Sequence, residues 1–377
     1  MRKVLLYIHL AACLVAGVVI MLLCITGIMI AFKPQIVAFS ESDAAYVGGA
    51  AAHAESIKLP AIVKNGEAFL PGGVRTIELE NNSDKAILIA GGKNSSVAYV
   101  NPWDGSLRKP QSTGMREFMQ TMTDLHRWLG LSGQYRPAGR FINGVGNALL
   151  LLLVVSGIYL WWPRKWSKKH LQAVAALNLG LKGRARHFNQ HNVIGLWTAP
   201  LLLVITLTAL PISFRAIDRL VSMAAGGETV SRDKSVRLLQ PLSTEDFRSG
   251  AADRILAGLV RENPQWQKIV IKRAAMASNR QRQAMLEIAL HEGGWLRKPP
   301  QTLILDGISG TVVKKDSYEE MSLARKLRFW ERTLHNGTAL GWIGQLAVTI
   351  GAMGGAALVY TGVLLALRRL KAPFSTI

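Results

Sequence analysis

The chain has 377 residues, of which 49% are hydrophobic, and its formal net charge is +21 at pH 7. This length could hold two or three soluble domains, but the hydrophobic content indicates a chain divided between lipid and water. So positive a charge would suggest nucleic-acid binding in a soluble protein. Here the basic residues lie next to long apolar runs, so we expect no nucleic-acid partner.

Four apolar runs are each long enough to cross a bilayer as a helix. A span of the hydrocarbon core, about 30 Å thick, needs about 20 apolar residues at about 1.5 Å each. The first run follows Arg2 and Lys3 and is longer than the apolar region of a cleaved signal peptide, so we predict an uncleaved signal anchor. The runs are Val4–Phe32, Phe141–Trp162, Val193–Phe214 and Leu340–Leu367.

Basic residues between the second and third runs predict the orientation. No acidic residue lies between Pro163 and His187, and by the positive-inside rule this short loop is cytoplasmic. Both termini are then cytoplasmic as well, and the connectors 33–125 and 215–334 lie in the periplasm. We therefore predict a multi-pass protein of the bacterial inner membrane. The basic residues of the loop are Arg164, Lys165, Lys168, Lys169, Lys182, Arg184 and Arg186.

The two long connectors have the pattern of small modules built mostly from strands. Gly66–Pro110 and Trp266–Lys315 alternate apolar and polar residues around Gly and Asn turns. Each ends in a similar phrase, Val100-Asn-Pro-Trp-Asp-Gly-Ser-Leu in the first and Leu305-Asp-Gly-Ile-Ser-Gly-Thr-Val-Val in the second. Leu242–Arg261 could add a helix to the second. We predict two α+β modules outside the membrane.

The spanning runs also repeat, which predicts two copies of helix, outer module, helix. His9 precedes Thr26-Gly27-Ile28 by seventeen residues, and His191 precedes Thr208-Ala209-Leu210 by the same number. The second and fourth runs match more loosely, and Arg136-Pro137 predicts a break between His126 and its span. Their shared features are Leu125-His126 and Leu334-His335 before the runs, and Ser156-Gly157-Ile158 and Thr361-Gly362-Val363 near the far ends.

The repeat places one histidine on each span, two near each face of the bilayer. His9 and His191 lie near the predicted cytoplasmic ends, while His126 and His335 lie at the outer starts. A lone interfacial histidine is ordinarily a wetted amphipathic side chain. Ionisable residues in spans mark functional sites, however, and four in equivalent positions favour ligands. Three others are predicted to be solvated and have no assigned role: His53, His170 and His291.

The donor set favours haem iron. The sites offer no thiolate and no obvious carboxylate to complete a zinc shell, whereas two histidines from facing helices suit axial ligation of a b-type haem. Pairing by leaflet predicts an inner haem between His9 and His191 and an outer haem between His126 and His335. Two such haems would make an electron path across the bilayer. His187, one turn before His191, is the competing inner ligand, or could bond a haem propionate or a phospholipid.

These motifs, in this order, resemble the PepSY-associated transmembrane family over nearly the whole chain. Within it the chain is most similar to the inner-membrane ferric-siderophore reductases of the FoxB type. The resemblance implies PepSY-like outer modules, b-type haems and one-electron reduction of siderophore-bound iron at the periplasmic face. The matching stretches are His126-Arg-Trp-Leu-Gly-Leu, His191-Asn-Val-Ile-Gly-Leu-Trp, Ser156-Gly-Ile-Tyr-Leu-Trp-Trp-Pro-Arg, Val100-Asn-Pro-Trp-Asp-Gly and Leu305-Asp-Gly-Ile-Ser-Gly.

The leading functional prediction is therefore a di-haem membrane oxidoreductase that reduces a ferric siderophore. Reduction would release the iron, because oxygen donors hold hard Fe(III) far better than softer Fe(II). The sequence has no recognisable dinucleotide glycine fingerprint, which predicts a separate electron donor in the cytoplasm or the membrane. Two alternatives remain open: a non-enzymatic binding or regulatory protein whose modules engage an envelope partner, and a transporter of iron or a siderophore.

The predicted fold class is a membrane α-helical bundle of four spanning helices with two small α+β, PepSY-like periplasmic modules and an internal two-fold repeat. Its segments follow the chain. They are helix 1 at 1–33, module 1 at 34–125, helix 2 with its outer entry segment at 126–163, the basic cytoplasmic loop at 164–186, helix 3 at 187–214, module 2 at 215–334, and helix 4 with the cytoplasmic tail at 335–377.

Overall fold

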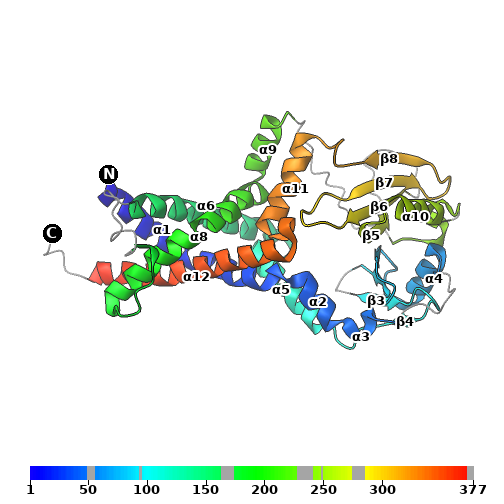
Figure 1. Cartoon of the computed structure of the whole chain (residues 1–377), viewed down its shortest axis with the longest axis horizontal. Coiled ribbons are helices and arrows are strands. Elements are labelled where there is room, and N and C mark those ends of the chain that lie inside the picture. The colour runs from blue at the N-terminus through cyan, green and yellow to red at the C-terminus, as the bar shows by residue number, and fades with distance from the viewer. Residues whose placement is uncertain are drawn as a thin grey trace. The chain divides into compact units, whose positions relative to one another are not determined.

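A computed structural model describes the chain in two compact units (Figure 1). The helical unit comprises Met1–Lys33, Met119–Ala224 and Leu327–Ile377, and the sheet unit comprises Pro34–Phe118 and Ala225–Lys326. The described residues are 1–48, 56–92, 96–162, 174–226, 241–247, 249–273 and 285–371. Outside them lie His53, His170 and four basic residues of the predicted cytoplasmic loop, Arg164, Lys165, Lys168 and Lys169.

Four helices in the described part of the chain are long and apolar enough to cross a membrane. Each predicted apolar run coincides with one of these helices except for a single residue at one end, so the membrane character is confirmed. The third helix begins well before its apolar run and takes in His187 and the basic residues ahead of it. The four are α1 (Arg2–Ala31), α6 (Arg136–Trp161), α8 (Gly183–Ser213) and α12 (Gly341–Lys371).

The four helices pack as a ring. Both α1 and α8 pack against α6 and α12, so α1 and α8 occupy opposite corners of the bundle. Each helix contributes to one buried cluster that includes Ile20, Leu150, Leu202 and Val359. Small residues let the backbones approach, as lipid-embedded helices require: a Cβ added to Gly354 would lie 2.3 Å from Thr198 Cγ2.

Short helices precede two of the spans, α5 (Gly114–Trp128) before α6 and α11 (Leu323–His335) before α12. Each turns sharply into its span, with Gly130 at φ 74° in one corner and Gly337 at φ 75° in the other. The corners are tight, because a Cβ added to Gly139 or Gly344 would lie 2.1 Å from a corner carbonyl oxygen. The break predicted after His126 is confirmed, although it precedes Arg136 and leaves Pro137 in the first turn of α6.

The sheet unit is built on eight antiparallel strands. Their order is β4-β3-β2-β1-β5-β6-β7-β8, so β1, from the first predicted module, pairs with β5, from the second. Strands of both connectors thus form one continuous sheet rather than two separate ones. The strands are β1 (Thr76–Glu80), β2 (Ile87–Ala90), β3 (Val97–Val100), β4 (Leu107–Arg108), β5 (Trp266–Arg273), β6 (Met285–Glu292), β7 (Gln301–Asp306) and β8 (Val312–Asp316).

Two helices, α4 (Leu59–Phe69) and α10 (Ala251–Glu262), complete the core of the sheet unit. Alternate strand residues point toward them, as a half-buried strand requires, and Ile77, Ile269 and Ile288 are fully buried. The helix predicted at Leu242–Arg261 is shorter than expected, since α10 begins only at Ala251 after a single 3₁₀ turn. Three further helices in the described residues are α2 (Lys33–Ser40), α3 (Ser42–Ala45) and α9 (Arg215–Ala224).

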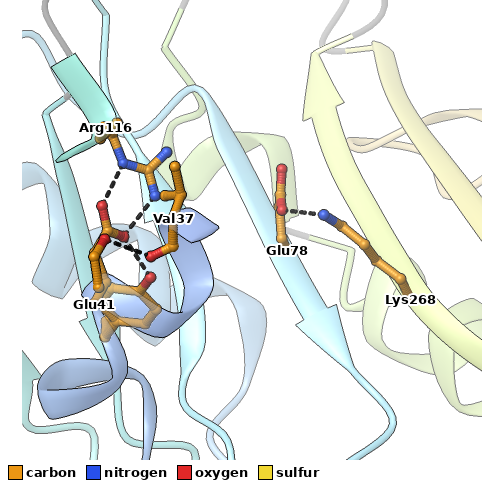
Figure 2. A network of polar contacts seen from close by, with 7 residues as sticks. Val37, Glu41, Glu78, Arg116 and Lys268 are labelled. Carbon is orange, nitrogen blue, oxygen red and sulfur yellow. Dashed lines mark hydrogen bonds and ion pairs between the residues drawn. The ribbon is translucent and has the colours of Figure 1, made fainter. Parts of the chain in front are cut away.

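A buried carboxylate ties α5 to the segment that follows α2. Glu41, whose side chain is fully buried, accepts hydrogen bonds from Arg116 Nε at 2.7 Å and Nη2 at 2.6 Å (Figure 2). It also accepts the Tyr99 hydroxyl at 2.7 Å, and burial together with this carboxylate raises the pKa of Tyr99. Nearby, Lys268 of β5 forms an ion pair with Glu78 of β1 across the junction of the two connectors (Figure 2).

Candidate functional site: two histidine pairs

Four histidines of the helical unit meet in two pairs. His9 of α1 and His191 of α8 lie on diagonally opposite helices of the bundle, and their ring centroids are 6.4 Å apart with the ring planes at 85° to each other. His126 of α5 and His335 of α11 have ring centroids 6.3 Å apart and planes at 49°. The structure therefore joins the same histidines that the predicted leaflet pairing joins.

In the first pair, each imidazole hydrogen-bonds a hydroxyl of a neighbouring span. His9 Nδ1 lies 2.8 Å from Ser156 Oγ of α6. His191 Nδ1 lies 2.9 Å from Thr361 Oγ1 of α12. Both histidines are thus held through the same nitrogen, by equivalent positions of two different helices.

The second pair is held in the same way. His126 Nδ1 lies 2.9 Å from Thr26 Oγ1 of α1. His335 Nδ1 lies 3.5 Å from Thr208 Oγ1 of α8 and closer, at 3.1 Å, to the carbonyl oxygen of Ile205. We call Ser156, Thr361, Thr26 and Thr208 the anchor hydroxyls.

The hydrogen-bond network favours one tautomer of these histidines. Each anchor hydroxyl has one proton, and it donates that proton to the carbonyl one turn earlier in its own helix, at 2.6 Å for Thr26, Ser156 and Thr208 and 2.7 Å for Thr361. A hydroxyl that donates there accepts from the imidazole Nδ1, which leaves the lone pair on Nε2. At His335 the Ile205 carbonyl oxygen can only accept, so this Nδ1 carries the proton.

Small residues after the anchor hydroxyls make room for the rings. A Cβ added to Gly27 would lie 3.4 Å from His126 Cε1, and one added to Gly157 would lie 3.6 Å from His9 Cε1. At Gly362 the distance to His191 Cε1 would be 3.3 Å. A branched side chain at these positions would displace the imidazole.

The two pairs lie near opposite ends of the bundle. His9 and Thr26, the anchor of His126, are seventeen residues apart on α1, which is about 25 Å along a helix. The apolar cluster around Ile20 and Leu202 lies along the same helices between these ends. The pairs are thus separated by a packed apolar core.

A facing pair of neutral imidazoles can hold one transition metal. The metal–nitrogen bond to histidine is about 2.0–2.1 Å, so rings on opposite sides of one metal have their centres roughly 6 Å apart. Both observed separations agree with this value. The described residues contain no cluster of three or more His, Cys, Asp or Glu placed around a metal, so each site offers its donors as a pair.

The other histidines of the described residues differ from these four. His187 lies one turn before His191 in α8, and its Nδ1 is buried without a hydrogen-bond partner. His291 lies on β6 opposite Lys268 and is half-buried, so the prediction that it is solvated is wrong. Burial, with the positive charges of Arg297 and Lys268, lowers the pKa of His291 to about 4.

The anchor hydroxyls were not assigned a role from the sequence. The dipeptides that contain them, such as Thr26-Gly27 and Ser156-Gly157, belong to the motifs from which the repeat was predicted. Ser, Thr and Gly are also common wherever helices pack in lipid, so the dipeptides alone do not indicate a contact with histidine. Thr26 and Thr208 follow His9 and His191 by the same seventeen residues, which is a signal that could have found these two anchors.

Four spanning helices with an ordered imidazole pair near each end define a polytopic membrane protein with two candidate metal sites. The model of the PepSY-associated TM region matches residues 6–369, and the chain belongs to that family. No curated protein matches the chain significantly.

Proposed function

We propose that the chain is a di-haem b-type membrane oxidoreductase that passes electrons across the bilayer and reduces ferric iron in a siderophore. The observation that carries the proposal is the presence of two imidazole pairs, each with its Nδ1 atoms anchored and its Nε2 atoms free to ligate. Haem b would supply the one-electron chemistry when bound, and the histidines would hold it rather than act as acids or bases.

The donor set fits haem. A pair of neutral imidazoles would supply the protein ligands of a haem iron. The ring separations of 6.4 and 6.3 Å would leave room for one iron between the two imidazoles of each pair. His9 and His191 would hold one haem, and His126 and His335 the other. His187 stays the competing ligand of the first site, since its Nδ1 has no partner.

The apolar core between the pairs favours electron transfer over transport. An ion or chelate that crosses the bundle needs polar groups along its route, because charge is costly in an apolar medium. The core cluster between the two ends is instead made of side chains such as Ile20, Leu150, Leu202 and Val359. Electron transfer does not need polar groups along the route. With one histidine pair near each end of the bundle, electrons could enter at one pair and leave at the other.

Basic residues support the orientation that we propose. The Arg2 guanidinium caps the end of α6 through the carbonyl oxygen of Trp162 at 2.5 Å, and Arg369 lies over the Tyr7 ring at 5.4 Å. By the positive-inside rule this end is cytoplasmic. Electrons would then enter at the His9–His191 pair from a cytoplasmic or membrane donor and leave at the His126–His335 pair, on the periplasmic side of the bacterial inner membrane.

The substrate that we propose is a ferric siderophore, as in the FoxB-type reductases. Each Fe(III) would take one electron, and the donor would lose one. The iron would then leave its chelate, because oxygen donors hold Fe(II) weakly. The regulatory alternative has the same membrane anchor but needs no redox centre.

Purified protein tests the proposal directly. We expect about two haems per chain, a reduced-minus-oxidised spectrum with b-type bands, and reoxidation of the reduced protein by a ferric hydroxamate. His9→Ala and His126→Ala should each remove one haem and leave the other, whereas His187→Ala should keep both. Protein purified from haem-replete cells without b-type bands would overturn the proposal. Retention of both haems in every single histidine variant would overturn the assignment of ligands.

A further inference from the structure

We propose that the anchor hydroxyls are positioning residues that hold the axial histidines in one tautomer and strengthen their Nε2 atoms as donors. This inference rests on the proposed function, since it concerns how the imidazoles bind iron. It assigns to Ser156, Thr361, Thr26 and Thr208 a role that neither their small size nor their place in the repeat requires.

The direction of the hydrogen bonds supports a positioning role for the anchor hydroxyls. An anchor hydroxyl gives its only proton to the carbonyl one turn earlier in its helix, as Thr26 does to Leu22 O at 2.6 Å. Its oxygen then accepts from the imidazole, as it does from His126 Nδ1 at 2.9 Å. An imidazole that donates from Nδ1 is more basic at Nε2, and its ring is held in orientation. A stronger donor stabilises ferric over ferrous iron and lowers the midpoint potential.

The anchor hydroxyls are not equivalent, because they differ in how closely they approach their histidines. His126 and His335 each have a backbone hydrogen bond, to Leu23 and Ile205, but Thr26 Oγ1 lies only 2.9 Å from His126 Nδ1. His335 Nδ1 lies 3.1 Å from the Ile205 carbonyl oxygen and 3.5 Å from Thr208 Oγ1, so the backbone carbonyl is its main acceptor. Thr208 therefore contributes less than Thr26, although the two face the two ligands of one site.

Because Thr208 lies farther from its histidine than Thr26 does, Thr208→Val is a matched control for Thr26→Val within the same site. Thr26→Val removes the hydroxyl that anchors His126 and keeps the shape of the side chain, while Thr208→Val makes the same change opposite His335. Thr26→Ser restores the hydroxyl. Both positions lie within a helix, so the two Thr→Val substitutions make the same chemical change and differ only in the hydrogen bond to histidine that each removes.

The experiment follows haem release to an apo-globin acceptor and the midpoint potential of each haem in the purified full chain. We expect Thr26→Val to release one haem about 10–100-fold faster, as loss of a partner behind a histidine ligand does, and to raise the midpoint potential of that haem. Thr26→Ser should resemble the wild type, and Thr208→Val should change release by less than about threefold.

The outcomes separate this inference from the proposed function. Wild-type protein that binds no haem overturns the proposed function itself. If haem is bound but Thr26→Val leaves both release and potential unchanged, the positioning role is refuted. Equal effects of Thr26→Val and Thr208→Val would refute the unequal anchoring. Loss of haem in Thr26→Ser as well would show that packing, rather than the hydroxyl, holds His126.

Discussion

The residue whose chemistry differs most from its sequence-based expectation is His291. A histidine in an extramembrane strand would ordinarily be solvated, but here it is half-buried opposite Lys268, and Arg297 adds a second positive charge. Both effects disfavour the imidazolium, so the pKa falls to about 4. The pairing of β6 with the preceding strand β5, which places Lys268 opposite His291, contributes to this shift.

The lowered pKa of His291 predicts a pH-dependent loss of stability. The imidazole is neutral in both states above its unfolded pKa of 6.5. As the pH falls from 6.5 toward 4, the unfolded chain binds a proton that the folded chain does not, so the free energy of unfolding falls. At this half-buried site we expect a loss of about 1–2 kcal/mol between pH 7 and pH 5, which His291→Gln should remove.

Thermal unfolding of the full chain in detergent measures this effect. The apparent Tm of the wild type should fall more between pH 7 and pH 5 than that of His291→Gln, by about 2–4 °C for each kcal/mol. Between pH 7 and pH 8 the two proteins should change in parallel, because the imidazole is neutral in both states there. Equal shifts in the acid range would show that His291 titrates normally.

At the scale of elements, the corners before α6 and α12 determine where the second histidine pair lies. His126 and His335 end short helices, and each short helix turns into its span over a few residues. The turn brings Gly344 against the carbonyl of Gly337, where a Cβ would lie 2.1 Å from the oxygen. Close approach of this kind needs glycine.

Gly344→Ala should therefore disturb the corner that carries His335. We expect the overpacked turn to cost about 1–3 kcal/mol, which a lower apparent Tm would report, and haem loss from the second site should accompany it. Gly195→Ala is the matched control in α8, because its Cβ would meet Leu358 Cδ2 at an ordinary 3.5 Å. If both variants melt alike, the corner tolerates a side chain.

At the scale of the whole molecule, the main finding is that the two long connectors share one sheet. The pairing of β1 with β5 places Ile77 opposite Ile271, and both are fully buried. The ion pair between Glu78 and Lys268 crosses the same junction over 190 residues of sequence. Residues of both connectors also enter one hydrophobic core.

One shared core predicts that the connectors unfold together. Ile77→Ala, in the first connector, should cost about 2–5 kcal/mol through the cavity that it leaves. Hydrogen exchange should then accelerate in β6 and β7 of the second connector as well as in β2. Val313→Ala, at an exposed position of β8, is the control and should change little. Faster exchange confined to the first connector would mean that the two fold independently.

Much of this arrangement could be predicted from the sequence. A helix that spans a bilayer must have a minimum length and an apolar composition, and both can be seen in the amino-acid sequence. The four spans follow from that requirement, and the strand patterns follow from alternation. The pairing of His9 with His191 and of His126 with His335 was expected because the two histidines of each pair were predicted to lie near the same face of the membrane.

Only the tertiary structure decided how these parts meet. The strands β1 and β5 pair through backbone hydrogen bonds, which every residue type except proline can form. The amino-acid sequence therefore does not reveal this pairing. Two separate modules were expected, but the strands form one sheet. The contact of Thr26 with His126 depends on the rotation and height of two helices, which hydrophobic periodicity does not determine. The sequence by itself determined which histidines lie near the same end of the spans, and the packing of the helices decided which nitrogen of each contacts a hydroxyl.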